Sequence, residues 1–245
     1  MSPYPAQDYY ADMKRRELQT QIDRTKTGLL LLVIGLIIGS LPFVSFIGGL
    51  LNIIGAILVI LGRNAFGPQH SRNASVSLIL YIGGAIVAGI GTAVFVFSIV
   101  SSRITGTVDQ ASITSAFQIF LATIVAQAAI SGIAIVLFTY QLQKQMGRIL
   151  LWVGYALSIA ISVVTFAYIS SILASSIASA FASGTYNPAP LQDLQSEASA
   201  FSVLGLIPAI IYAIAYYIAR ERILRGEIPI LQQPYDRTAM PPATY

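Results

Sequence analysis

Apolar residues are grouped along this chain into long runs that short polar stretches separate. The first run, residues 28–62, holds about 35 residues without a charge and is interrupted only near Pro42, whereas one crossing of the hydrocarbon layer needs about 20. We therefore predict a transmembrane hairpin with helices at about 27–41 and 43–62, and with Pro42 in the first turn of the second helix. Four further spans are predicted at about 76–100, 113–140, 149–183 and 198–219.

Composition agrees with this pattern. Hydrophobic residues make up 56% of the chain, charged residues only 10%, and the mean hydropathy is +0.74, values outside the range of soluble domains. The apolar runs are continuous and longer than the alternating strands of a membrane barrel. The sequence therefore predicts an all-α fold, a polytopic helical bundle with about six transmembrane helices in the lipid bilayer.

Positive charges predict the orientation of the bundle. Six crossings place 13 of the 14 Lys and Arg residues on one side of the membrane and leave only Arg103 on the other. Because cytoplasmic loops carry the excess of Lys and Arg, we expect both termini in the cytoplasm of a cell-membrane protein. The expected organisation is a charged N-terminal segment at 1–27, a transmembrane domain at 28–219, and a flexible, proline-containing tail at 220–245. The net charge is only +4, and the basic residues lie beside membrane segments, where cytoplasmic Lys and Arg are expected in any case. We therefore predict no nucleic-acid partner.

Residue types that carry catalysis are nearly absent. The chain has no cysteine and only one histidine, His70, and no charged residue lies within a predicted span. Charged groups inside spans usually mark proton relays or ion paths, and no paired-histidine motif or phosphate-binding glycine loop is present. We therefore predict no enzymatic activity, no cofactor and no metal site.

Two polar clusters are candidates for binding. The run GRNAFGPQHSRN at 62–73 and the arginines after the last span both lie at the predicted cytoplasmic interface, where basic side chains bind lipid headgroups or other phosphates. The alternative is that the arginines only anchor helix ends, with His70 an ordinary loop residue. The predicted contact residues are Arg63, Asn64, His70, Arg72, Arg220, Arg222 and Arg225.

Small residues predict where helices pack. Gly35 and Gly39 have the GxxxG spacing that allows close approach of two helices, and Asn52 is expected to bond across the hairpin, although a ligand contact is the alternative. Glycines at 83, 84, 89 and 91 predict tight packing of the third span, and Pro208 is expected to bend the last one. The fifth segment carries two rows of small residues four apart, which share a face, while Ile172 is expected to point elsewhere. These rows are Ser171, Ser175 and Ser179, and Ala174, Ala178 and Ala182.

The glycine-rich hairpin followed by GRNAFGPQHSRN resembles the archaeal membrane proteins grouped as domain of unknown function 973. The likeness covers most of residues 15–225. It implies an archaeal cell membrane and carries no assigned activity or functional residues. The sequence thus favours a structural or accessory subunit of a membrane assembly, or a homo-oligomer, whose partners are other membrane subunits or itself. The alternative is a channel or facilitator for a small neutral solute.

Overall fold

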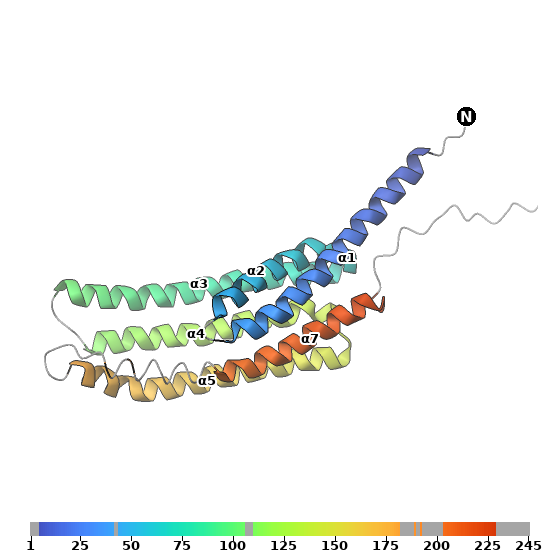
Figure 1. Cartoon of the computed structure of the whole chain (residues 1–245). Helices are drawn as coiled ribbons and strands as arrows, with labels where there is room; N and C mark the ends of the chain where they lie inside the picture. Colours follow the sequence, from blue (N-terminus) through green and yellow to red (C-terminus); the bar gives the residue numbers. More distant parts are fainter. Residues whose placement is uncertain are drawn as a thin grey trace, which may run out of the picture.

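Long apolar segments must satisfy their own backbone hydrogen bonds in a bilayer, which favours helices. The computed structural model describes residues 5–41, 44–105, 110–181, 189, 192 and 203–228. Every element in these ranges is a helix, which confirms the all-α prediction (Figure 1). The elements are α1 (Pro5–Gly39), α2 (Ser45–Gly62), η1 (Arg63–Phe66), α3 (Pro68–Thr105), α4 (Gln110–Thr139), η2 (Tyr140–Leu142), α5 (Gln145–Phe181), η3 (Val203–Gly205) and α7 (Leu206–Leu224).

Five segments of the described residues are long and apolar enough to cross a membrane, so the chain is a multi-pass membrane protein. Residues 27–39 of the first predicted span, 27–41, instead form the last third of α1, and the charges lie in the part of the helix that precedes them. Its apolar part is only about 20 Å long at 1.5 Å per residue, less than the hydrocarbon thickness. The count of six crossings therefore stays a prediction. The five segments are Ser45–Phe66, Pro68–Ser101, Ala111–Leu142, Gln145–Ile172 and Val203–Leu224.

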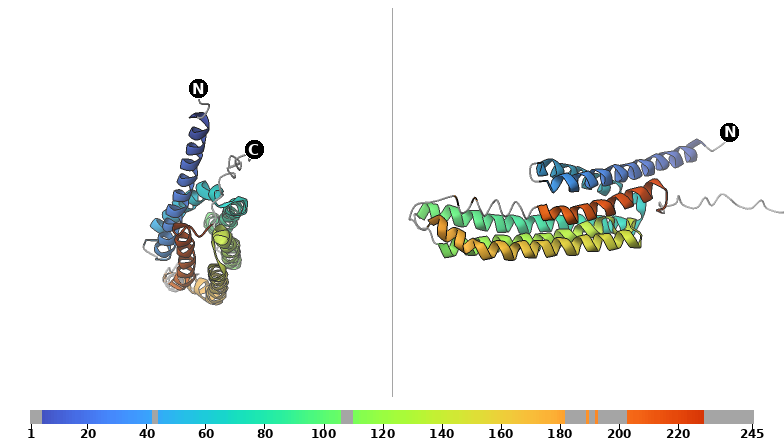
Figure 2. Two further views of the ribbon diagram at one scale, coloured as in Figure 1. Left: turned by 90° about the vertical axis from the view of Figure 1, so that its right-hand side faces the viewer. Right: turned by 60° about the horizontal axis from the view of Figure 1, so that its bottom comes forward.

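The helices pack in the spatial order α2, α1, α7, α5, α4, α3. We call the end of the bundle that holds η1, η2 and the last turn of α7 the basic end, and the end that holds the last turn of α3 and the first turn of α4 the far end. The hairpin of α1 and α2 and the helix α7 lie beside only the half of α3, α4 and α5 that is nearer the basic end (Figures 1 and 2). The first half of α1 projects outward from the basic end.

Glycines bring α1 and α2 into backbone contact. A Cβ added at Gly28 would lie 2.6 Å from the carbonyl oxygen of Gly55, and one added at Gly48 would overlap the backbone of Gly39. Gly35 lies directly against Asn52. Side chains larger than hydrogen would separate the two helices, so the glycines allow the close packing on which membrane helix pairs depend.

The contact between α3 and α4 uses only two of the four glycines that the sequence suggested. Gly84 lies against Ser131, and Gly91, seven residues later on the same face, lies against Thr123. Gly83 and Gly89 face open space, so the prediction that they pack tightly is wrong. Residues three, four or seven apart share one face of a helix. Gly83 and Gly89 are one and five residues from Gly84, so they lie on a different side of α3.

Two separate groups of buried side chains divide the bundle. The larger core lies toward the basic end, where Leu29, Val59, Leu142 and Leu151 are almost completely buried. The smaller group, toward the far end, has Leu121 and Ile169 at its centre, with partly buried neighbours that include three phenylalanines and Ile172. Ile172 is thus partly buried against this group, and the expectation that it points away from the alanine row stays a prediction because the side chains of that row are not described.

Two sequence expectations about helix shape meet different outcomes. The fifth segment is one continuous helix of 37 residues, about 55 Å long at 1.5 Å per residue, so it exceeds the hydrocarbon layer without breaking. The last helix begins at Leu206, which places Pro208 in its first turn. A proline in the first turn removes no helical hydrogen bond, so α7 itself gives no cause for a bend, and the expected bend of the span at 198–219 stays a prediction because residues 193–202 lie outside the described ranges.

Candidate functional site

The polar run after the hairpin is helical for most of its length, not a loop. Arg63–Phe66 forms η1, Gly67 adopts a φ of 94°, and Pro68 opens α3. Glycine tolerates this left-handed backbone, and proline suits the first helical position because its missing N–H has no partner there. This local chemistry begins α3 eight residues before the predicted span at 76–100, and it places the polar side chains on helical faces.

His70 lies in the interior of the basic end. Its side chain is 0% exposed, its ring meets Phe66 edge to face with centroids 5.6 Å apart, and neither ring nitrogen has a hydrogen-bond partner among the described residues. A lipid headgroup cannot reach a fully buried ring. The prediction that His70 contacts a headgroup is therefore corrected, because the first turn of α3 directs its ring inward.

The other predicted contact residues of this run separate into two positions. Asn64 and Arg72 line one open groove with Ser71, whose hydroxyl donates to Asn64 Oδ1 over 2.9 Å. Arg63 is half-buried beside this groove without lining it, and its Nε has no hydrogen-bond partner among the described residues. Asn64 and Arg72 thus remain available at the surface of the basic end.

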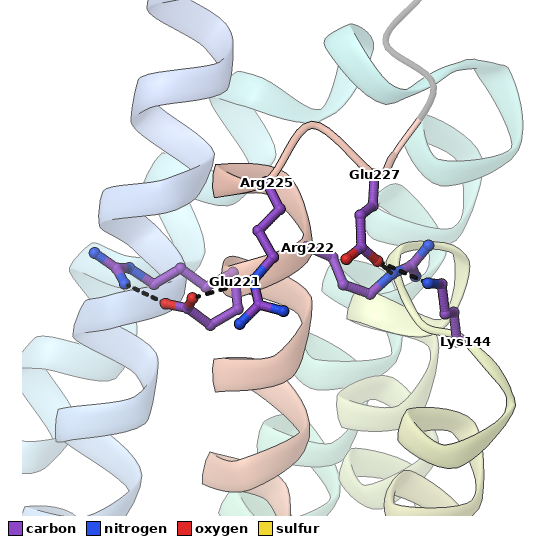
Figure 3. A network of polar contacts seen from close by, with 6 residues as sticks. Lys144, Glu221, Arg222, Arg225 and Glu227 are labelled. Carbon is purple, nitrogen blue, oxygen red and sulfur yellow. Dashed lines mark hydrogen bonds and ion pairs between the residues drawn. The ribbon is translucent and has the colours of Figure 1, made fainter.

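The arginines at the end of α7 are held by carboxylates (Figure 3). Glu221 lies 3.5 Å from Arg220 and 3.9 Å from Arg225, and Glu227 lies 3.5 Å from Arg222. Glu227 also accepts a 2.8 Å ion pair from Lys144, which precedes α5. The two carboxylates offset part of the positive charge for which the sequence predicted contact with anionic lipid. Neither Lys144 nor the glutamates were among the predicted site residues.

A helix cap positions Glu227. The N–H of Glu227 donates to the carbonyl of Arg222 over 2.9 Å, and the N–H of Gly226 donates to Ile223 over 3.1 Å, with Gly226 at a φ of 66°. This is the Schellman arrangement, which closes a helix and reverses the chain. Arg220–Leu224 therefore belongs to α7, and Ile228 is buried against the core, so the predicted flexible tail does not begin at Arg220. Residues 229–245 lie outside the described ranges.

Buried side chains tie α7 to the turn between α4 and α5. Gln143 Nε2 donates to the carbonyl of Ala215 over 2.6 Å, Tyr216 donates to the carbonyl of Ile135 over 3.0 Å, and Arg222 donates to the carbonyl of Leu142. Each bond joins a side chain to a backbone carbonyl that is 72 to 81 residues away in the chain. Sequence reasoning missed Gln143 and Tyr216, because one Gln or Tyr at a span end has no periodic signal, and it assigned Arg222 to lipid contact instead of to this carbonyl.

The pKa of Glu227 is lowered below its ordinary value, first because Lys144 donates a hydrogen bond to the carboxylate and further because both Lys144 and Arg222 are positively charged. Desolvation opposes this shift. A lowered carboxylate pKa means that the charged form is favoured in the folded protein. The contact therefore stabilises the fold above the ordinary pKa of a glutamate and is lost as the pH falls through the lowered value.

The structure describes the side chains of only some of the residues that were predicted to pack between helices. Asn52 touches Gly35, but its Oδ1 is buried without a hydrogen-bond partner among the described residues, so no bond across the hairpin involves that atom. Ser171 donates to the carbonyl of Tyr168 within α5 and is exposed. The backbone at Ala174, Ser175, Ala178 and Ser179 is helical, their side chains are not described, and Ala182 lies outside the described residues.

The fold defines a multi-pass, all-helical integral membrane protein, and the polar, positively charged side chains described above lie at its basic end. Within the described ranges, no group of three or more His, Cys, Asp or Glu side chains is placed to hold a metal ion. No protein-family model, curated protein or solved structure matches the chain.

Proposed function

We propose that this chain is a non-enzymatic membrane protein that acts through helix packing, as a structural or accessory subunit of a membrane assembly or as a homo-oligomer. The position and surface of α2 carry this proposal. Helix α2 lies at the edge of the bundle and packs mainly on α1. A helix in that position has most of its surface available to lipid or to another subunit.

The two faces of α2 differ sharply in side-chain size. The face toward α1 is nearly without side chains, since its buried residues are Gly48, Gly55, Val59 and Gly62. The remaining surface carries large apolar side chains, and Phe46 is 77% exposed. Because lipid tails are as apolar as these side chains, association through this surface depends on shape and dispersion. The exposed members are Phe46, Ile47, Leu50, Ile53, Ile54, Ile57 and Leu61.

Cross-linking in native membranes tests this proposal, and the absence of cysteine from the chain makes the test clean. Ile54→Cys, on the exposed surface of α2, should cross-link to a second copy or to one partner of fixed stoichiometry. Ile86→Cys, on the exposed surface of α3, is the matched control and should not. If neither position cross-links and the natively extracted particle is a monomer, the subunit role is wrong. A homo-oligomer around a continuous polar lumen would instead favour the channel alternative.

The proposed setting is a cell membrane with both termini in the cytoplasm. The arrangement of charge supports this orientation, because the described Lys and Arg residues lie toward the basic end except Arg103, near the far end of α3. The proposed relationship to the domain of unknown function 973 rests on the hairpin and the run at 62–73. It implies that the membrane is archaeal and implies no activity.

A further inference from the structure

An amphipathic groove lies on the outer side of α5 at the basic end. Its volume is about 790 Å³, and its residues change in character along the helix axis. The upper part carries Lys144, Gln145 and Arg148, and the lower part is apolar. The apolar residues are Ile149, Trp152, Val153 and Ala156. None of the groove residues belongs to the lipid contacts expected from the sequence.

The guanidinium of Arg148 is held in place at the top of this groove. Its Nε donates to the carbonyl of Tyr140 over 3.3 Å, and its centre lies 4.7 Å from the centroid of the Tyr140 ring. Such a cation–π contact orients the planar group. These contacts use Nε and one face of the guanidinium, and a guanidinium has further N–H donors that suit a phosphate.

The charge at the rim of the groove is positive. Lys144 and Arg148 line the rim, and Glu227, the carboxylate that contacts Lys144, is shared with Arg222. The lining of the groove itself holds two positive side chains and no carboxylate. An anionic group would complement the excess, and basic side chains at a membrane surface attract such headgroups.

The depth of the groove selects a lipid over a soluble anion. From Arg148 to Ala156 the helix rises about 12 Å at 1.5 Å per residue, which leads from the interface into the hydrocarbon layer. Trp152 lies one turn below Arg148 and is 48% exposed, and tryptophan is enriched at the membrane interface. A free phosphate would use the rim and leave this apolar wall without a partner.

We propose that this groove binds one membrane lipid with an anionic phosphate headgroup. Arg148 and Lys144 contact the phosphate, and an acyl chain lies along Ile149, Trp152, Val153 and Ala156. The bound lipid covers the outer side of the turn between α4 and α5, which Gln143 joins to α7.

Trp152 is the only tryptophan of the chain, so its fluorescence reports directly on this groove. The full chain is reconstituted in phosphatidylcholine vesicles that contain a minor fraction of phosphatidylglycerol with brominated acyl chains, which quench tryptophan on contact. Quenching should exceed that produced by brominated phosphatidylcholine at the same mole fraction. Arg148→Gln should weaken this preference about fivefold, the effect of about 1 kcal/mol for one basic residue near an anionic surface.

Controls separate this site from a general effect of charge. Lys144→Gln, on the same rim, should lower the preference, whereas Arg72→Gln, in a different groove of the basic end, should leave it unchanged. An unchanged emission maximum and elution volume establish that each variant is folded. Equal quenching of the parent by both brominated lipids overturns the proposal, as does a preference that persists in both rim variants. Recovery of emission on adding inorganic phosphate would identify a soluble anion and overturn the assignment to lipid.

Discussion

The basic end and the far end of the bundle are held together in different ways. At the basic end, side chains of Gln143, Tyr216 and Arg222 donate to backbone carbonyls of distant helices, beside a large buried core. At the far end, Phe95, Phe117 and Phe120 contact one another with ring centroids 5.0 to 5.7 Å apart, around a small core. The first arrangement joins particular partners, and the second depends on packing alone.

This difference follows from where each end lies. Apolar burial does not draw helices together inside a bilayer, because lipid is an equally apolar surrounding. Contacts at the far end therefore contribute mainly dispersion and ring geometry. Hydrogen bonds at the basic end fix the position of α7 against α4 and α5. We expect the basic end to determine stability and the far end to tolerate substitution better.

The orientation of the bundle can be tested by cysteine labelling, and the expected result is all or none. A single cysteine replacing Ser71, at the basic end, should react with a membrane-impermeant reagent only after cells are permeabilised. A cysteine replacing Ser102, near the far end of α3, should react in intact cells. The reverse pattern would contradict the predicted orientation.

The hairpin of α1 and α2 should show the largest change in stability. Gly48→Leu forces a side chain into the backbone of Gly39, so we expect a loss of about 3 kcal/mol, at the upper range of overpacking. The neighbouring Gly49 has open space at its Cβ, and Gly49→Leu is the matched control, with little effect. Thermal unfolding in a mild detergent measures both variants. Equal behaviour would mean that the hairpin does not pack through this face.

A smaller loss is expected from the polar contacts of the basic end. Gln143→Leu removes the side-chain hydrogen bond between the α4–α5 turn and the carbonyl of Ala215, which should reduce stability by about 1 to 2 kcal/mol. Gln118→Leu, on the exposed side of α4, should be nearly neutral. Thermal unfolding in the same detergent measures both variants. If Gln143→Leu is as stable as the parent, α7 is held by packing and not by this hydrogen bond.

The far end should respond less than the basic end. Phe117→Leu removes the contacts with Phe95 and Phe120, and such aromatic pairs contribute about 1 kcal/mol beyond their buried area. Phe97→Leu is the control, because Phe97 is 72% exposed. A loss for Phe117→Leu larger than that for Gln143→Leu would reverse the ranking of the two ends.

The smallest effect is expected at Glu227 and depends on pH. Because Lys144 and Arg222 lower the pKa of Glu227, its contribution to stability is present above the ordinary glutamate value of 4.5 and is lost as the pH falls through the lowered pKa. Glu227→Gln should unfold slightly earlier than the parent at neutral pH, and the two should converge in acid. A difference that grows in acid would contradict this sign.

The candidate site was only partly predictable. Sequence alone located the polar segments that meet at the basic end, because charged residues occur only outside the predicted spans. It did not show that Glu221 and Glu227 pair with the arginines of α7, or that His70 is buried. Lys144 and Arg148 were used only for orientation, since nothing in the sequence placed them at the top of a groove.

The sequence by itself determined that this protein is an all-helical, multi-pass membrane protein with its positive charges gathered outside the spans. The physical reason is that the bilayer constrains length and polarity along the chain, and both can be read one residue at a time. Only the tertiary structure decided which helices are neighbours, which face of α3 turns His70 inward, and how the cap at Gly226 returns Glu227 to Lys144. Those features depend on pairs of residues far apart in the chain, and aliphatic side chains that resemble one another do not specify the partner of a helix.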